Sequence, residues 1–269
     1  MIKNSNVTAL FLFILCFFSP VSCGEVTGSA TVSEAINNNI SVVIERNQLQ
    51  KILDAGDDLP SVMFALKLLS DDAKRKGQPS PKYNLCLLSS IIAKGKSKES
   101  LLCANNKGIP RIKMPQIAGI PKAGSKAEQL VKEGKLKQDP ITKNVDLKDI
   151  FIKWVSEERG HTVFTAMELP ASSLKATQNE IIGSIVADMW WQLKQNPNVP
   201  LVRDPIFISK DYYILDGHHR WAAIVASEYG NKELKEIKIP VQIIDIDIIE
   251  LVKEANEFVN DYGILPHSG

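Results

Sequence analysis

The sequence lacks a strong net charge and a cysteine pattern of the metal-binding kind. Its 269 residues include 32 Lys and Arg against 31 Asp and Glu, a formal net charge of +1. No overall basic field is therefore available for nonspecific binding to nucleic acid. Hydrophobic residues make up 44% and charged residues 23% of the chain. This composition argues against global disorder, and the length suits one large domain or two modest ones.

The apolar run near the N-terminus is short. It extends from Val7 to Phe18 after a single Lys3, and small residues follow up to Cys23. A membrane-spanning helix needs about 20 apolar residues, so we expect no stable membrane span. The layout is typical of a secretory signal peptide, residues 1–23, and predicts a secreted or periplasmic protein. Cys23 also suits lipoprotein anchoring, although Pro20 stands where such a signal usually has an aliphatic residue.

Cysteines are few. Two of the four, Cys16 and Cys23, lie in or beside the expected signal, so the mature chain keeps Cys86 and Cys103. In an oxidising compartment these two can form a disulfide, which would stabilise the fold by about 3 kcal/mol. Two buried helical thiols are an equal alternative. Their spacing fits no zinc pattern.

Periodicity and turn signals divide the rest of the chain. Apolar residues recur at helical spacing within residues 24–105, with a break at residues 77–81 that contains Gly and two Pro. This predicts a small helical region with a packing or partner-binding role. Residues 106–145 are rich in Gly, Pro and Lys, which is typical of a linker or a wrapping arm. Helical and extended patterns intermix over residues 146–263, so we expect an α+β or mixed α/β domain there.

The C-terminal domain has a distinct order of predicted elements. They are a helix over residues 147–155, a strand over 162–169, a helix from Asn179 or Glu180 to about 195, hairpin strands at 205–208 and 212–215, a helix over 221–229, a strand over 239–244, and a helix over 248–259 that ends at Gly263.

The turn Asp216-Gly217-His218-His219-Arg220 is the most informative stretch. A strand ends just before it and a helix begins at once. Gly217 leaves room for a ligand at the backbone, and the unpaired N–H groups of a first helical turn attract anions. The two imidazoles add donors, and the guanidinium can bind phosphate in a bidentate way. The pattern predicts an anion site at a helix N-terminus; the plainer alternative is that Asp216 caps the helix and the basic residues decorate the surface.

The residues from Leu215 to Ala223, LDGHHRWAA, resemble the signature of the ParB/sulfiredoxin superfamily, most of all members with an Asp-Gly-His-His-Arg core. Residues 174–180 resemble the segment before the first helix of that domain, and the resemblance covers residues 165–247. It implies a ParB/sulfiredoxin-like C-terminal domain that binds a nucleotide or a nucleic-acid-type ligand. The implied phosphate-binding residues are Gly217, His218, His219 and Arg220.

The resemblance also implies a reaction, either phosphoryl transfer or the nuclease-type cleavage of ParB-like nucleases. His218 or His219 would act as general acid or base, and Asp216 would help to hold Mg²⁺. The related serine kinases have a catalytic Glu in the stretch that matches residues 174–180, where this chain has Gln178. Gln cannot act as a base, so Glu180 would take that role in a shifted register. The turn contains no cysteine, so sulfiredoxin activity is not expected.

Other functions remain open at this stage. Gln178, in place of a catalytic Glu, favours a non-catalytic nucleotide-binding switch that contacts a protein partner through the helical N-terminal region. A ββα-metal nuclease is a third hypothesis, but residues 221–229 lack the Asn or His that its metal site needs. Asp245 and Asp247 would share one face of a strand and could bind a cation, although a polar strand end is the favoured interpretation.

Overall fold

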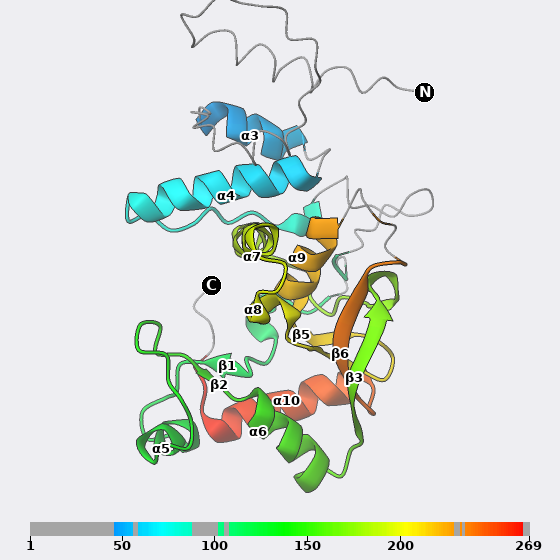
Figure 1. Cartoon of the computed structure of the whole chain (residues 1–269). Helices are drawn as coiled ribbons and strands as arrows, with labels where there is room; N and C mark the ends of the chain where they lie inside the picture. Colours follow the sequence, from blue (N-terminus) through cyan, green and yellow to red (C-terminus); the bar gives the residue numbers. More distant parts are fainter. Residues whose placement is uncertain are drawn as a thin grey trace, which may run out of the picture. The chain divides into compact units, whose positions relative to one another are not determined.

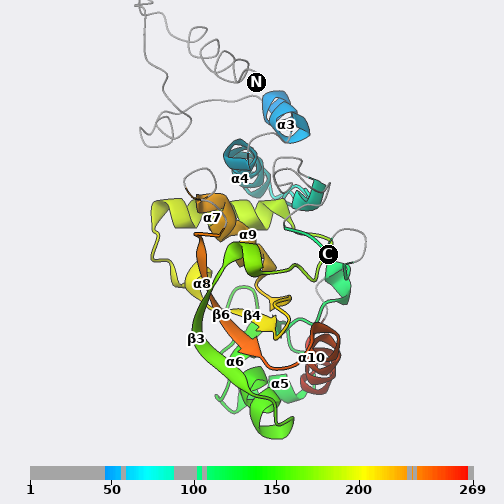
Figure 2. The same cartoon turned by 90° about the vertical axis from the view of Figure 1, so that its right-hand side faces the viewer.

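A four-stranded sheet and the helices packed against it make up Glu45–Gly269, which forms one unit with an α+β fold (Figures 1 and 2). The α+β class predicted from the sequence is confirmed. The computed structural model describes residues 46–55, 59–87, 102–104, 108–228, 232 and 235–265. The expected signal peptide and Cys23 lie outside these residues. Within the described part of the chain, no helix has the length and apolar character that crossing a bilayer requires.

The main sheet has the strand order β3-β6-β4-β5. Its strands are β3 (Val163–Pro170), β4 (Ile206–Ser209), β5 (Ile214–Asp216) and β6 (Lys238–Ile244). The predicted hairpin is confirmed, because β4 and β5 pair in antiparallel fashion, and β6 then runs parallel to β4 and antiparallel to β3. β5 therefore lies at the edge of the sheet opposite to β3, and helix α9 (His218–Glu228) begins shortly after it.

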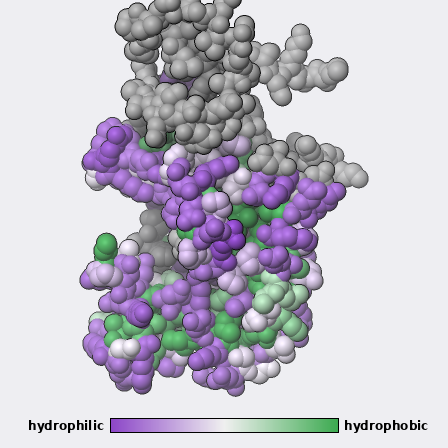
Figure 3. Space-filling view, in the orientation of Figure 1, coloured by the Kyte–Doolittle hydropathy of each residue, from purple (hydrophilic) through white to green (hydrophobic). Residues whose placement is uncertain are grey.

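The edge strand β3 is irregular. Its pairing with β6 shifts between Phe164 and Met167, and Ala166 has a φ of 57°. Phe164 and Met167 are 46% and 38% exposed, and Figure 3 shows hydrophobic residues gathered over β3. A bulge of this kind interrupts the row of free backbone groups and discourages pairing with another chain.

Helices α7 (Gly183–Gln195) and α9 (His218–Glu228) pack against each other, and the short α8 (Pro200–Arg203) lies between them in sequence. We expected α7 to start at Asn179 or Glu180, but it begins at Gly183. The residues before it are extended, because their backbone groups are bonded to other parts of the chain.

Helix α10 (Ile248–Tyr262) packs with α6 (Lys148–Lys153) and the π-helix η5 (Trp154–Glu158) that continues α6. The rings of Phe151 and Trp154 lie 5.1 and 5.4 Å from that of Phe258, centroid to centroid. Asp247 caps α10, and the helix ends at Gly263 as predicted, in the left-handed conformation with a φ of 70°. Glycine adopts this conformation readily.

The segment predicted as a linker, residues 106–145, is more ordered than its composition indicated. It contains η4 (Arg111–Lys113), β1 (Ala118–Gly119) and α5 (Lys126–Lys132), and β1 pairs with β2 (Val145–Asp146). The buried side chains of Ile117 and Ala127 join the core beneath α10. The apolar residues that hold this segment against the core are widely spaced in the sequence. Their spacing therefore shows neither the periodicity of a helix nor that of a strand.

The helical N-terminal region contains α3 (Arg46–Ala55), α4 (Leu59–Arg75) and the short η1 (Leu85–Leu87). The predicted third helix is described only up to residue 87. Helix α4 packs against both α3 and α7. Cys86 and Cys103 form a disulfide, with their Cα atoms 5.5 Å apart, which decides between the two alternatives for these cysteines.

Candidate functional site

The turn between β5 and α9 depends on Gly217. Its φ of 107° lies in a region that residues with a side chain rarely adopt. A Cβ atom at this position would lie 2.9 Å from Ile206 Cγ1 and 3.1 Å from Arg220 Nη2. The space beside Gly217, which the sequence led us to assign to a ligand, is therefore occupied by β4 and by the arginine of the same turn.

Arg220 is paired inside the protein. Its side chain is 6% exposed, and Nη2 donates to the carboxylate of Asp216. Nη1 donates to the Asp204 carbonyl at 3.4 Å and lies 4.0 Å from the Asp204 carboxylate. The two carboxylates remain partly exposed, at 36% and 48%. A phosphate would therefore reach this guanidinium only by replacing one of its two acidic partners.

His218 is almost fully buried, with 1% of its surface exposed. Its Nε2 accepts hydrogen bonds from the backbone N–H groups of Thr177 (3.0 Å) and Gln178 (3.3 Å). Burial, helped by the neighbouring His219, lowers the pKa of His218 to about 3. The ring is therefore neutral near pH 7, and because Nε2 is an acceptor the proton lies on Nδ1.

His219 has a parallel role. It is partly buried, and its Nε2 accepts a hydrogen bond from the Ile182 N–H at 3.2 Å. Thr177 adds a third link, because its hydroxyl donates to the Ile214 carbonyl at 2.6 Å. The start of α9 and the first residue of β5 are thus bonded to residues 177–182, which we call the upstream segment. The structure brings the two stretches of the predicted site into contact.

The other two predicted catalytic residues lie on this upstream segment in different surroundings. Gln178 is 7% exposed, and its Oε1 has no hydrogen-bond partner among the described residues. Glu180 is exposed and faces a small cavity that also contains Arg111. The side chains at 178 and 180 therefore do not form one paired acid–base centre.

The upstream segment is held from two further directions. Its backbone bonds to Ala104 and Ile109 on one stretch, through Ala104 N to Gln178 O (2.9 Å) and Ile109 N to Thr177 O (2.8 Å). Leu85 N donates to Ile181 O of the segment (2.9 Å), and Gly183 N, directly after the segment, donates to Tyr83 O (2.7 Å). The Cys86–Cys103 disulfide joins these two anchoring stretches.

No protein-family model, curated protein or solved structure matches the chain. The resemblance to the ParB/sulfiredoxin superfamily therefore depends on the residues of the turn and of the upstream segment, and it stays a prediction.

The predicted metal contacts have other partners. Among the described residues, no three His, Cys, Asp or Glu side chains gather where they would hold a metal ion. Asp216 pairs with Arg220. The Asp247 carboxylate accepts from Ile249 N (3.0 Å) and Glu250 N (3.1 Å) as a helix cap, and Asp245 lies exposed beyond β6. Asp245 and Asp247 both follow the end of β6 at Ile244, so they do not share one face of a strand.

One buried carboxylate was not identified from the sequence. Glu254 is 6% exposed, and its Oε1 lies 2.9 Å from Nε2 of the partly buried His161. A signal was available, because Glu254 falls within the apolar stripe of α10 between Leu251 and Phe258. An acidic residue on a buried helix face needs a partner.

Proposed function

We propose that this chain is an exported ParB/sulfiredoxin-like protein that binds a nucleotide or phosphodiester ligand at the N-terminus of α9. One observation carries the proposal: His218 and His219 bond to the upstream segment, which lies about 40 positions earlier in the sequence. The two stretches that resemble the family therefore meet at one place, although nothing local in the sequence requires them to do so.

Backbone donors at this helix end support an anionic ligand. The first hydrogen bond of α9 runs from Trp221 N to Gly217 O at 2.8 Å. Among the described residues, the N–H groups of His218 and Arg220 have no acceptor. Such N–H groups, together with the helix dipole, favour phosphate at a helix N-terminus.

We propose phosphoryl transfer or phosphodiester cleavage as the reaction. Arg220 would stabilise charge on the phosphate after exchanging an acidic partner for it. His219 is the better acid–base candidate, because His218 is a neutral ring with 1% of its surface exposed, whereas His219 is only partly buried. Glu180 is an exposed alternative base. Asp216 and Asp204 are partly exposed carboxylates beside the site. This is a donor set that Mg²⁺ uses together with the phosphates of a ligand.

A binding-only function is the second candidate. Both imidazoles of the turn use Nε2 as a structural acceptor, and a Gln replaces the Glu of the serine kinases. These two facts favour a nucleotide-binding switch. Ligand binding would then act on the upstream segment and, through residues 83–85, on the helical N-terminal region.

The disulfide supports export. Disulfides persist in oxidising compartments and are rare in the cytosol, so the Cys86–Cys103 bond agrees with the signal peptide expected at residues 1–23. The expected alternative of lipid attachment at Cys23 remains a prediction.

Binding and turnover by the full chain test both candidates. ADP, ATP, CTP and a short labelled oligonucleotide would be offered with and without Mg²⁺ to the wild type and to His219→Gln. Glutamine keeps an acceptor for the Ile182 N–H but cannot exchange a proton near neutral pH. If the chain is an enzyme, the variant should bind normally and lose about 10²- to 10⁴-fold in turnover.

The remaining outcomes are distinct. Binding by the wild type with no turnover under any metal condition would select the switch and rule out catalysis. No binding of any of these ligands would contradict both candidates. Lys153→Gln, a lysine on α6 away from the turn, is the control and should match the wild type.

A further inference from the structure

A small cavity adjoins the upstream segment. Its volume is about 160 Å³, and three parts of the chain line it: Lys82, Tyr83 and Asn84; Arg111 and Ile112; Glu180 and Ile182. Sites for drug-sized ligands usually measure about 300–1,000 Å³. This cavity therefore suits a single chemical group and not a complete nucleotide.

Arg111 gives the cavity its charge. The residue is partly buried, and among the described residues its guanidinium has no hydrogen-bond or ion-pair partner. Burial lowers its pKa, and the charge of Glu180 acts in the opposite direction. An arginine stays charged in proteins, and a partly desolvated charge without a direct partner is unfavourable. An anion in the cavity would relieve this cost.

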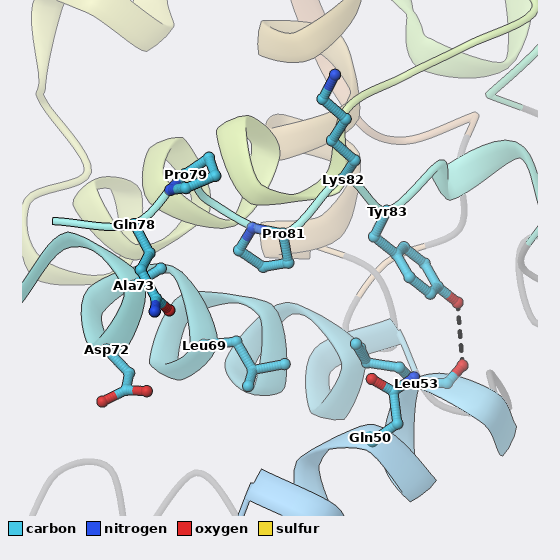
Figure 4. Close-up of a pocket in the computed structure, with 10 residues that line it drawn as sticks. All are labelled: Gln50, Leu53, Leu69, Asp72, Ala73, Gln78, Pro79, Pro81, Lys82 and Tyr83. Atoms are coloured by element: carbon cyan, nitrogen blue, oxygen red, sulfur yellow. Dashed lines mark hydrogen bonds between the residues drawn. The ribbon is translucent and has the colours of Figure 1, made fainter. Parts of the chain in front are cut away.

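Lys82 supplies a second cation. Figure 4 shows the neighbouring cavity, of about 180 Å³, between α3, α4 and residues 78–83. There the Tyr83 ring turns toward α3 and its hydroxyl donates to the Leu53 carbonyl at 3.0 Å, whereas Lys82 points to the opposite side of the chain. Lys82 lines the cavity of Arg111, as Tyr83 does, and alternation along an extended chain explains why the two side chains point to opposite sides.

The walls of the cavity are fixed in advance. The Asn84 side chain accepts from Ile181 N at 3.1 Å and donates to the Asn179 carbonyl at 3.5 Å. Asn179 N in turn donates to the Ile109 carbonyl at 3.2 Å. These bonds hold all three parts of the lining before any ligand arrives, which lowers the entropy lost on binding.

We propose that this cavity is an anion subsite that binds one phosphate group, with Arg111 and Lys82 as its charge partners. Glu180, on the same cavity, limits the affinity by repelling the anion and is not a catalytic base in this role. The phosphate belongs either to the ligand held at α9 or to a separate phosphate ion. The helical N-terminal region thereby contributes to binding through Lys82.

The test measures binding of inorganic phosphate and pyrophosphate to the full chain by calorimetry. Arg111→Gln should weaken binding by about tenfold or more, because a charge-assisted hydrogen bond is lost. Lys113→Gln is the matched control: it removes the same charge from the same short helix, but the residue is exposed and does not line the cavity. It should bind like the wild type. Glu180→Gln should strengthen binding by about threefold.

Equal affinities of Arg111→Gln and Lys113→Gln would overturn the inference, as would absence of phosphate binding by the wild type. Arg111→Lys guards against a folding artefact, because it keeps the charge and should retain part of the affinity. Competition between phosphate and a nucleotide would show that the subsite binds a phosphate group of the nucleotide. Simultaneous binding of the two would show that it binds a separate phosphate ion.

This inference and the proposed function can fail independently. If Arg111→Gln binds nucleotide and phosphate as well as the wild type does, the site at α9 is supported and this subsite is ruled out. If the wild type binds phosphate but no nucleotide, and Arg111→Gln loses the phosphate, the subsite is supported and the proposed function is ruled out.

Discussion

At the scale of single residues, the histidines of the turn act first as acceptors. Their Nε2 atoms receive backbone N–H groups at 3.0–3.3 Å, which ties the upstream segment to α9. His218 can do this only as a neutral ring, because a protonated imidazole has no acceptor. Protonation of His218 would therefore also break its hydrogen bonds to the upstream segment.

This coupling predicts a specific pH dependence of stability. The pKa of His218 is about 3 in the folded chain against an ordinary 6.5. As the pH falls below 6.5, the unfolded chain binds a proton that the folded chain does not, so the wild type loses stability between pH 6.5 and about 3. The slope approaches about 1.4 kcal/mol per pH unit.

His218→Gln isolates this effect, because glutamine keeps an acceptor and does not titrate. Urea unfolding should show a smaller loss of stability in the variant than in the wild type between about pH 7 and pH 5. Equal slopes for the two proteins, or NMR signals of His218 that titrate near its ordinary pKa, would show that the ring is not held in a neutral state.

The turn glycine predicts a second single-residue effect. Gly217→Ala forces a side chain into a φ of 107° and against Ile206 Cγ1, whereas Gly160→Ala meets only backbone strain, because no atom lies within 4 Å of its Cβ position. The excess loss in Gly217→Ala should be about 1–3 kcal/mol, the usual cost of overpacking. Chemical denaturation measures it. Equal losses of stability in the two variants would mean that Ile206 of β4 can move away from the new methyl group at no cost in free energy.

At the scale of elements, the upstream segment is a short extended stretch that other elements hold in place. Residues 83–85, residues 104–109 and the start of α9 all bond to it. Its main-chain groups are therefore satisfied by long-range bonds and not by a helix, which explains why α7 begins only at Gly183. The disulfide links the first two of these anchors.

Removing the disulfide should weaken the attachment of the upstream segment to residues 83–85 and 104–109. The double variant Cys86→Ser, Cys103→Ser loses the closure of a loop with a sequence separation of 17, which is worth about 3 kcal/mol in the chain-entropy account. Thermal unfolding should show the loss. Reducing agent should produce the same shift in the wild type and none in the variant. Unchanged stability on reduction would contradict a structural disulfide.

At the scale of the whole molecule, the helical N-terminal region and the sheet region belong to one unit, Glu45–Gly269. Their contact is close: a Cβ at Gly183 would lie 2.7 Å from Leu66 Cδ1 of α4. The net charge of +1 provides little long-range attraction for an anion, so ligand binding depends on local groups such as Arg111 and Lys82.

One unit implies cooperative unfolding. Leu66→Ala, at a side chain with no exposed surface, should lower the free energy of unfolding by about 2–5 kcal/mol. Tryptophan fluorescence and far-ultraviolet circular dichroism should report the same single transition. Ile249→Ala is the control, because this residue is 81% exposed and should change stability by less than about 0.5 kcal/mol. Two separate transitions in Leu66→Ala would indicate independent units.

The sequence by itself determined the features with local causes. Two short apolar segments and the short connection between them predicted the β4–β5 hairpin, and the apolar stripe with Gly263 predicted α10 and its end. The turn at residues 216–220 was located for the same reason, because a strand, a glycine and a helix start adjoin there. Strand and helix patterns depend on neighbours within a few residues, so they can be read along the chain.

Only the tertiary structure decided the features that depend on distant residues. The pairing of Cys86 with Cys103, the late start of α7 and the core position of Ile117 follow from contacts across the chain. So do the neutral state of His218 and the pairing of Arg220 with Asp216 and Asp204. Burial and electrostatics act through space, so the sequence of the turn shows its donors and charges but not the distant residues to which the fold bonds them.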